Sequence, residues 1–120
     1  MRILIAGGRG MLGSDLVEAC AARKWEAVPL DLPELDITNP ARVESGLPAG
    51  DAVINCAAFT RVDDAEKERD LCWRINADGA GVLARACAAR GLPLIQLSTD
   101  YVFNGRKGSP YVESDPVEPL

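Results

Sequence analysis

The stretch "IAGGRGMLGSDL", residues 5–16, places a cluster of glycines between an apolar run and an amphipathic one. Glycine loses more backbone entropy on folding than other residues, so such a cluster needs a structural reason. Gly7, Gly10 and Gly13 form the pattern G-x-x-G-x-x-G directly after a predicted strand at 2–6. A helical pattern of apolar residues follows them. In this strand-loop-helix context the pattern predicts a dinucleotide-binding loop, with a purely structural turn as the alternative.

Each glycine of the pattern has a distinct predicted role. Gly7 permits the tight turn, and Gly10 lets a diphosphate approach the backbone amides at the helix start. Gly13 lets the helix pack closely on the strand. Asp31 follows the second predicted strand, where an acidic side chain can bind ribose hydroxyls; a solvated carboxylate is the alternative. An Asp there suits NADH and repels the extra phosphate of NADPH, but Arg9 would offset that repulsion, so both cofactors stay open.

The rest of the chain alternates strand and helix patterns. Apolar, β-branched runs predict buried strands at 2–6, 26–30, 51–58 and 92–98, and helical spacing appears at 11–23, 36–47 and 71–90. For the second helix, Thr38 or Asn39 is the predicted N-cap, before Pro40. Gly79 and Gly81 are expected to permit close packing of the third helix on the sheet. This order predicts an α/β fold, a Rossmann-type doubly wound parallel sheet. Ligands of such sheets bind beyond the carboxyl ends of the strands.

Composition narrows the class of protein. The chain has 120 residues, enough for one domain, with 48% hydrophobic and 26% charged residues. The net charge of −5 is spread along the chain, which argues against nucleic acid or an anionic membrane as a partner. Neither a signal peptide nor a membrane span is visible.

Cysteine usage points to a cytoplasmic protein without a metal site. The four cysteines are widely spaced in apolar surroundings, and the chain has no His and no C-x-x-C pair. We therefore expect no metal site, and reduced, buried cysteines. These are Cys20, Cys56, Cys72 and Cys87.

Several segments resemble the extended short-chain dehydrogenase/reductase family, namely "GGRGMLG", "NCAAFT", "INADGAGVLARAC" and "LSTDYVFNG". Within that family, "STDYVFNG" followed by "PYVESDPVEPL" is similar to the branch of dTDP-4-dehydrorhamnose reductases. The similarity covers residues 1–120. It implies an NAD(P)H-dependent oxidoreductase that reduces the 4-keto group of dTDP-4-dehydro-L-rhamnose to dTDP-L-rhamnose. Its partner would be the dTDP-sugar substrate, and a homodimer of the full-length protein stays open.

The resemblance also assigns cofactor roles by position. The diphosphate would lie against the glycine loop, the ribose on Asp31, the adenine near the start of the second helix, and the rest of the cofactor along the segment after the third strand. Asn76 matches a helix asparagine that helps to organise a proton-relay water; a helix-surface Asn is the alternative. The implied cofactor-binding residues are Gly7, Gly10, Met11, Leu12, Gly13, Asp31, Asp36, Ile37, Ala57, Ala58 and Asn76.

A further group of implied site residues follows the last predicted strand. Thr99 would be the catalytic hydroxyl that donates a hydrogen bond to the substrate carbonyl oxygen as it gains charge. Asp100 and Tyr101 would edge the substrate pocket. Simple capping of the strand end by the hydroxyls of this stretch is the alternative.

The catalytic pair of the family, Tyr-x-x-x-Lys, does not occur in this sequence. In that pair the Lys lowers the pKa of the Tyr, which protonates the carbonyl oxygen. Here Tyr101 is followed four residues later by Gly105, and Tyr111 by Asp115. In the resembling reductases the pair comes shortly after a segment like "DPVEPL". We therefore expect residues 1–120 to be an amino-terminal coenzyme-binding portion, inactive alone, without the substrate-binding lobe and with an exposed sheet edge.

Two other functions stay open beside the reductase. The regulatory subunit of methionine adenosyltransferase looks similar in this region and acts by binding a partner. A nucleotide-sugar epimerase of the same superfamily is the other alternative. A dehydratase is disfavoured, because it would need Asp-Glu after Thr99, and Tyr101 does not replace a carboxylate base at neutral pH.

Overall fold

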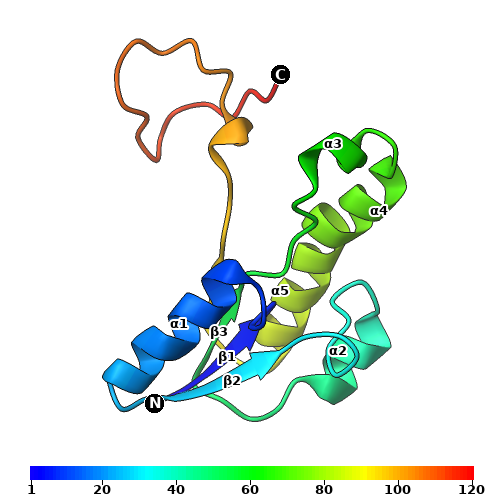
Figure 1. Cartoon of the computed structure of the whole chain (residues 1–120), viewed down its shortest axis with the longest axis vertical. Coiled ribbons are helices and arrows are strands. Elements are labelled where there is room, and N and C mark those ends of the chain that lie inside the picture. The colour runs from blue at the N-terminus through cyan, green and yellow to red at the C-terminus, as the bar shows by residue number, and fades with distance from the viewer.

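The computed structural model describes residues 1–120 and is built around a four-stranded sheet in the order β2-β1-β3-β4 (Figure 1). All neighbouring strands are parallel. This confirms the predicted doubly wound α/β fold. The strands are β1 (Arg2–Ala6), β2 (Glu26–Leu30), β3 (Ala52–Asn55) and β4 (Leu94–Gln96).

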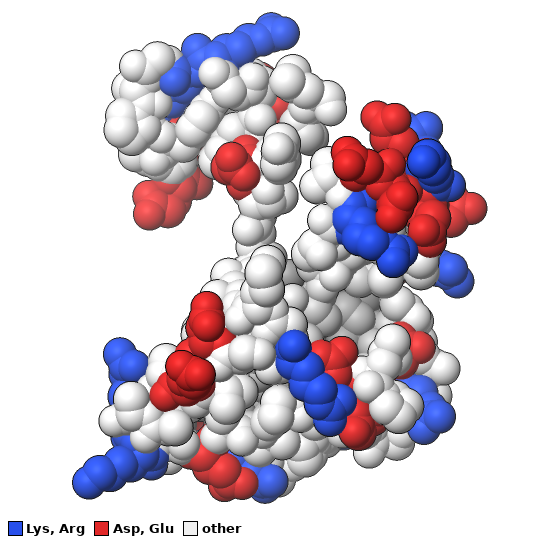
Figure 2. Space-filling view, viewed as in Figure 1, with Lys and Arg blue, Asp and Glu red and all other residues white.

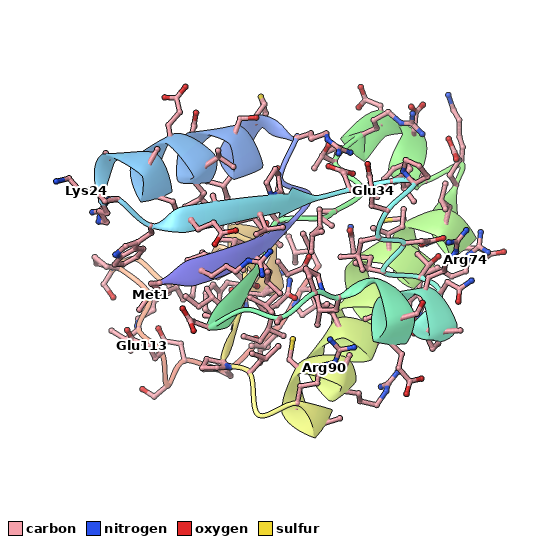
Figure 3. The ribbon with its side chains drawn as sticks, turned by 90° about the horizontal axis from the view of Figure 1, so that it is seen from below. Met1, Lys24, Glu34, Arg74, Arg90 and Glu113 are labelled. Atoms are coloured by element: carbon pink, nitrogen blue, oxygen red, sulfur yellow. The ribbon has the colours of Figure 1, made fainter.

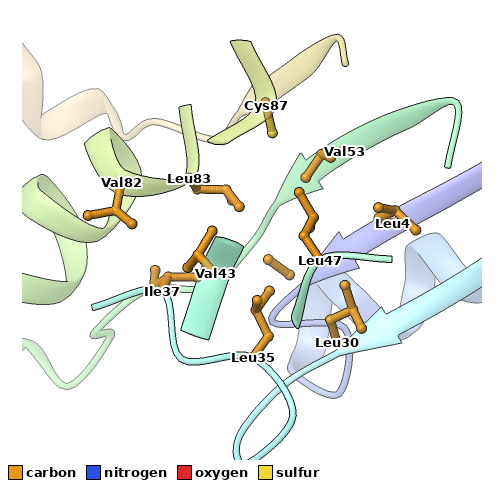
Figure 4. Close-up of a cluster of buried hydrophobic side chains, with 11 residues drawn as sticks. Leu4, Leu30, Leu35, Ile37, Val43, Leu47, Val53, Val82, Leu83 and Cys87 are labelled. Atoms are coloured by element: carbon orange, nitrogen blue, oxygen red, sulfur yellow. The ribbon is translucent and has the colours of Figure 1, made fainter. Parts of the chain in front are cut away.

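Helices cover both faces of the sheet because the side chains of β1 alternate between them. Ile3 and Ile5 pack with Cys20 of α1 (Met11–Ala22) on one face. Leu4 lies on the other face, in a larger core with α2 (Pro40–Gly46) and α5 (Ala80–Ala89) (Figure 4). That core comprises Leu4, Ala6, Leu30, Leu35, Ile37, Val43, Leu47, Val53, Val82, Leu83 and Cys87.

Both ends of α2 are tied to side chains. The side-chain oxygen of Asn39 accepts a hydrogen bond from the Arg42 amide at 3.2 Å, so Asn39, one of the two predicted candidates, is the N-cap and Pro40 the first helical residue. At the other end, the Arg90 guanidinium donates to the carbonyl oxygens of Glu44 and Leu47. Arg90, at the end of α5, therefore binds the two helices together (Figure 3).

The prediction of a buried strand over 92–98 is wrong in length and in burial. β4 has only three residues and lies at the sheet edge, next to β3 alone. Ile95 is 57% exposed and Leu97 41% exposed. The apolar pattern reflects faces that no element of this chain covers. The strand predicted at 51–58 is also shorter, because β3 ends at Asn55.

The helical stretch predicted at 71–90 consists of three consecutive pieces. These are α4 (Arg69–Trp73), the π-helical η1 (Arg74–Gly79) and α5, and the short α3 (Val62–Ala65) precedes them. The expected packing of two glycines on the sheet is wrong. A Cβ on Gly79 would meet the Ile37 side chain at 2.9 Å, and one on Gly81 would meet only Arg85, at 3.3 Å. Gly79 thus makes room for the loop before α2.

The cysteines are free thiols, but only half of them are buried. Cys20 and Cys87 lie in the core as predicted, whereas the prediction is wrong for Cys56 and Cys72, which are partly exposed. Cys56 follows β3 and packs against the Ile3, Ile5 and Cys20 cluster, and Cys72 lies within α4. Burial raises the pKa of the Cys56 and Cys87 thiols, which keeps both in the unreactive neutral form.

Residues 100–120 form a carboxyl-terminal segment that extends from the sheet on a single extended stretch (Figure 1). It begins with the short 3₁₀-helix η2 (Asp100–Val102) and is closed on itself by a hydrogen bond of 3.0 Å from the Glu118 amide to the Val102 carbonyl. Inside it, the rings of Phe103 and Tyr111 stack at 4.1 Å. The space-filling view shows this segment joined to the α/β body by a narrow neck (Figure 2).

Charges of both signs are interspersed over the visible face, most densely around α3 and α4 (Figure 2). There Arg61 pairs with Asp64 at 3.2 Å and with Glu68 at 3.2 Å. None of the helices combines the length and the hydropathy that crossing a lipid bilayer requires.

Candidate functional site

The glycine loop lies at the carboxyl edge of the sheet, between the ends of β2 and β3. The Gly7 amide donates to the Leu30 carbonyl at 2.9 Å. Gly7 has a φ of +70°, and a Cβ there would lie 2.6 Å from the Ala57 nitrogen. Only glycine combines this left-handed conformation with so close an approach of two backbones. Gly7 and Ala57, both predicted site residues, are therefore in direct contact.

The start of α1 presents unpaired backbone amides. Its N-cap, Gly10, has extended backbone angles and no side chain to cap the helix. The amides of Met11, Leu12 and Gly13 donate to no backbone or side-chain acceptor. Together with the helix dipole, such amides favour an anion at this point.

Gly13 holds this helix start in place, but not against the strand as predicted. A Cβ on Gly13 would lie 2.2 Å from the Gly7 carbonyl oxygen and 2.7 Å from the Gly8 Cα. The first turn of α1 therefore packs on the glycine loop, whereas Cys20 further along the helix packs on β1. By contrast, a Cβ on Gly10 would meet only the Gly7 carbonyl oxygen, at 3.3 Å, so the space over the free amides is open.

Three apolar side chains at the start of α1 and in the loop after β2 are exposed. Met11 is 91% exposed, Leu12 46% and Leu32 65%. Small-molecule sites typically combine apolar walls with a few placed polar groups. Met11 and Leu12, both implied cofactor-binding residues, are thus exposed at the helix start.

Asp31 lies beside the glycine loop, as the fold requires of a residue that directly follows β2. Its carboxylate accepts hydrogen bonds from the Arg9 amide at 3.3 Å and the Leu32 amide at 3.1 Å. The Arg9 guanidinium does not turn to Asp31. It donates to both carboxylate oxygens of Glu34, at 2.9 and 3.0 Å, and to the Leu32 carbonyl at 3.4 Å.

This contact of Arg9 with Glu34 closes the loop after β2 onto the glycine loop, and Glu34 lies beyond the end of β2 in Figure 3. The hydrogen bonds from Arg9 lower the pKa of the Glu34 carboxyl to about 2. The same contact raises the pKa of Arg9. The sequence reasoning missed Glu34, since no local signal pairs it with a residue of the glycine loop.

The two residues expected near the adenine are held by the chain itself. The Asp36 carboxylate accepts from the Thr38 amide at 2.9 Å and from the Thr38 hydroxyl at 2.7 Å. The Ile37 side chain is 5% exposed and belongs to the core. The Ile37 side chain is therefore part of the core, and Oδ1 of Asp36 is already bound by Thr38.

A buried amide organises the end of β3. Asn55 is 1% exposed, its Oδ1 accepts from the Ala57 amide at 3.1 Å, and its Nδ2 donates to Gln96 of β4 at 2.8 Å. Asn55 thereby fixes the turn that brings Ala57 against the glycine loop, while Ala58 is exposed. Asn55 was not predicted as a site residue, although a lone polar residue ending the apolar run "AVIN" is a signal that could have found it.

Asn76 lies in η1 and holds the loop after β3. Its Oδ1 accepts from the Phe59 amide at 2.8 Å, and its Nδ2 donates to the Phe59 carbonyl at 3.1 Å and to the Cys72 sulfur at 3.5 Å. π-Helical turns are frequent at functional sites. In this structure Asn76 is a positioning residue for the loop and makes no contact with the glycine loop.

Thr99, Asp100 and Tyr101 lie where the chain leaves the sheet for the carboxyl-terminal segment. The Thr99 hydroxyl caps η2, accepting from the Tyr101 amide at 3.2 Å, and bonds to the Asp100 carboxylate at 3.2 Å. Tyr101 is 75% exposed. The structure thus does not bring these three residues to the glycine loop, which lies at the foot of the extended stretch (Figure 1).

The groups that the structure does bring together are the free amides of α1, Asp31 and Ala57. In this arrangement the amides and the positive end of the helix dipole can bind a diphosphate, and the Asp31 carboxylate can accept a hydrogen bond from a neighbouring hydroxyl group. No group of three or more Cys, Asp or Glu side chains converges to hold a metal ion.

Comparisons with known proteins extend this description. The family described as "RmlD substrate binding domain" matches residues 1–120. A dTDP-4-dehydrorhamnose reductase from Mycobacterium tuberculosis is 45% identical over 118 residues, which cover 98% of this chain and 38% of that protein. The chain therefore spans about two fifths of the length of the curated relatives it matches.

Solved structures give the same result. A dTDP-4-dehydrorhamnose reductase from Clostridium acetobutylicum superposes with a TM-score of 0.92 at 41% identity, covering 99% of this chain and 43% of that one. A second reductase of this name, from Bacillus anthracis and in complex with NADP, has a TM-score of 0.91 at 41% identity, covering 98% of this chain and 43% of that one.

Proposed function

This chain belongs to the RmlD substrate binding domain family, and from that premise we propose that it is the coenzyme-binding portion of a dTDP-4-dehydrorhamnose reductase. The full-length protein would reduce the 4-keto group of dTDP-4-dehydro-L-rhamnose to give dTDP-L-rhamnose, with NADH or NADPH as the reductant. The family description refers only to substrate binding, whereas the residues gathered in this chain fit the coenzyme.

The observation that carries the proposal is the group of unpaired, accessible backbone amides at the start of α1. Met11, Leu12 and Gly13 offer N–H groups without acceptors, and the N-cap Gly10 leaves the space above them free. A side chain at Gly10 would fill that space. This geometry fits a diphosphate, whose oxygens accept from amides and whose charge matches the helix dipole.

Other residues of this edge would hold the remaining parts of the coenzyme. Asp31 would accept hydrogen bonds from ribose hydroxyls, and Ala57 and Ala58 would line the path along the end of β3. Asp36 and the backbone of Ile37 would lie near the adenine. When bound, the coenzyme supplies a hydride.

The roles of Asn76 and the residues after β4 also belong to the proposal. Asn76 would act on the site through the loop at Phe59 that it holds. The Thr99 hydroxyl would donate to the carbonyl oxygen of the substrate, stabilising the charge that develops there, and Asp100 and Tyr101 would edge the sugar pocket. For this to happen, the stretch that carries them must close toward the glycine loop from the position it has here.

The length of the relatives supports the proposal that the substrate-binding lobe lies outside these 120 residues. Relatives of this name are more than twice as long as the 120 residues, and the sequence contains no Tyr-x-x-x-Lys pair. We propose that the pair and the substrate-binding lobe reside in a longer protein that contains these residues. On this proposal the 120 residues bind the coenzyme without turning over substrate.

Calorimetric titration of the chain with NADH and NADPH tests the coenzyme site. We expect the wild type to bind at least one of them and Gly10→Val to lose this binding, because the valine side chain would stand over the free amides. Gly108→Val is the matched control, since a Cβ at Gly108 meets nothing within 4 Å. Absence of binding by the wild-type chain, at unchanged circular dichroism, would refute the proposal.

Assay of the full-length protein separates the reductase from its alternatives. Oxidation of NADH or NADPH that depends on dTDP-4-dehydro-L-rhamnose identifies the reductase. Nucleotide binding without any sugar turnover would instead indicate the regulatory module, and interconversion of sugar epimers without net coenzyme oxidation the epimerase.

A further inference from the structure

The contact of Arg9 with Glu34 lies where the two nicotinamide coenzymes differ. They differ by one phosphate on the adenosine ribose, which the fold places at the residue directly after β2. In this chain that residue is Asp31, and its carboxylate accepts from the Arg9 amide. A side chain next to Asp31 therefore contacts a ribose hydroxyl when NAD(H) binds and a phosphate when NADP(H) binds.

Arg9 is a cation of the glycine loop whose amide binds Asp31, and its guanidinium already has partners. It donates to both oxygens of Glu34 and to the Leu32 carbonyl. Its two terminal nitrogens therefore make a bidentate contact with a carboxylate of the same chain. The contact lies at the surface, where the Arg9 side chain is 53% exposed and the Glu34 side chain 50%. The pair is therefore open to an incoming anion.

The local charge follows from these three residues. Asp31 and Glu34 contribute two negative charges and Arg9 one positive charge, a net charge of −1 at the place where the extra phosphate would enter. A phosphate would have to displace Glu34 from Arg9 and lie close to both carboxylates. A ribose hydroxyl, in contrast, donates to Asp31 and leaves the pair of Arg9 and Glu34 intact.

We infer that Glu34 is a specificity-determining residue which, by holding Arg9, sets this site in favour of NAD(H) over NADP(H). The inference rests on the proposed coenzyme site. Membership of the family does not make this choice, because the relative from Bacillus anthracis was solved with NADP.

Calorimetric titration of the chain with NAD⁺ and NADP⁺ tests the inference. The wild type is expected to bind NAD⁺ more tightly than NADP⁺. Glu34→Gln should lower the ratio of the NADP⁺ to the NAD⁺ dissociation constant by about tenfold, because it removes one repulsive charge and frees the guanidinium. Glu18→Gln, an exposed carboxylate on α1 without a hydrogen-bond partner, changes the net charge equally and should leave the ratio unchanged.

A second pair of variants shows whether Arg9 is the group that Glu34 controls. In the Arg9→Met background, Glu34→Gln should change the ratio by less than about threefold, because no guanidinium is left to release. An equal gain in both backgrounds would overturn the inference, since Glu34 would then act by charge alone. All of these side chains are exposed, and circular dichroism checks that each variant folds.

The outcomes separate this inference from the proposed function. Binding of both nucleotides by the wild type with a ratio that Glu34→Gln does not change overturns the role of Glu34 and leaves the coenzyme site standing. Tighter wild-type binding of NADP⁺ than of NAD⁺ also overturns it. Binding of neither nucleotide overturns both.

Discussion

Gly7 is the single position on which the geometry of the loop depends most. It combines a φ of +70° with a Cβ position 2.6 Å from the Ala57 nitrogen. An alanine there would meet backbone atoms, which do not yield as the end of a flexible side chain does. The conformation and the contact therefore act together.

We predict that Gly7→Ala lowers the free energy of unfolding by about 2–4 kcal/mol, from the left-handed conformation and the backbone clash together. Chemical denaturation measures the change. Gly91→Ala is the control, because Gly91 has a φ of +64° with nothing within 4 Å of its Cβ position. It should cost only about 1 kcal/mol. Equal losses in the two variants would show that the contact with Ala57 is unimportant.

The contact of Glu34 with Arg9 predicts how stability depends on pH. The hydrogen bonds from Arg9 lower the pKa of Glu34 from 4.5 to about 2. Because the folded-state pKa is depressed, the contribution of the pair to stability is present above pH 4.5 and is lost as the pH falls toward 2. Titration of the Glu34 carboxyl carbon by NMR should give a midpoint well below 4.5, and Arg9→Met should return it toward that value. An unshifted midpoint in the wild type would contradict the contact.

At the scale of elements, the loops that form the site are held by side chains from other elements. Asn76 of η1 binds both backbone groups of Phe59, and Asn55 of β3 binds both Gln96 of β4 and the Ala57 amide. Both asparagines offer a donor and an acceptor on one rigid amide, which suits them to fix a backbone segment from outside.

We predict that Asn76→Ala releases the loop after β3 without unfolding the chain. Loss of the two bonds should cost about 1–2 kcal/mol locally and speed hydrogen exchange of the Phe59 amide about tenfold. Asn39→Ala removes the same side chain from the N-cap of α2 and should leave the exchange at Phe59 unchanged. Protection of Phe59 equal to that of the wild type would mean that Asn76 does not hold the loop.

At the scale of the whole molecule, stability rests on the core between the sheet, α2 and α5. Leu83 lies in that core with 0% exposure (Figure 4). The edge strand β4 and the carboxyl-terminal segment contribute little to it, since Ile95, Leu97 and Tyr101 are all exposed. The α/β core therefore buries more apolar surface than β4 and the carboxyl-terminal segment do.

We predict that Leu83→Ala lowers the free energy of unfolding by about 3 kcal/mol and the Tm by about 10 °C, through lost burial and the cavity it leaves. Thermal unfolding followed by circular dichroism measures this. Leu120→Ala removes the same atoms from a residue that is 96% exposed and should change the Tm very little. Similar Tm values for the two variants would place the core elsewhere.

Much of the fold follows from patterns within a few residues of each other. The apolar run at 3–6, the glycines after it and the Asn39-Pro40 start of α2 are local features, and they predicted β1, the glycine loop, the start of α2 and the parallel sheet correctly. The glycine loop falls at the carboxyl edge for the same reason, because parallel strands all end at one edge. Burial of β4 was predicted wrongly, since an apolar pattern does not tell whether anything covers it.

Some contacts depended on the folded chain alone. Arg9 and Glu34 are 25 residues apart, Asn55 and Gln96 are 41 apart, and Phe59 and Asn76 are 17 apart. The amino-acid sequence by itself determined the order of the elements and the position of the loop, because periodicity and glycine conformation act locally. Only the tertiary structure decided which carboxylate binds the Arg9 guanidinium and which asparagine side chains hold the loops. Side chains distant in sequence meet only after the sheet has formed.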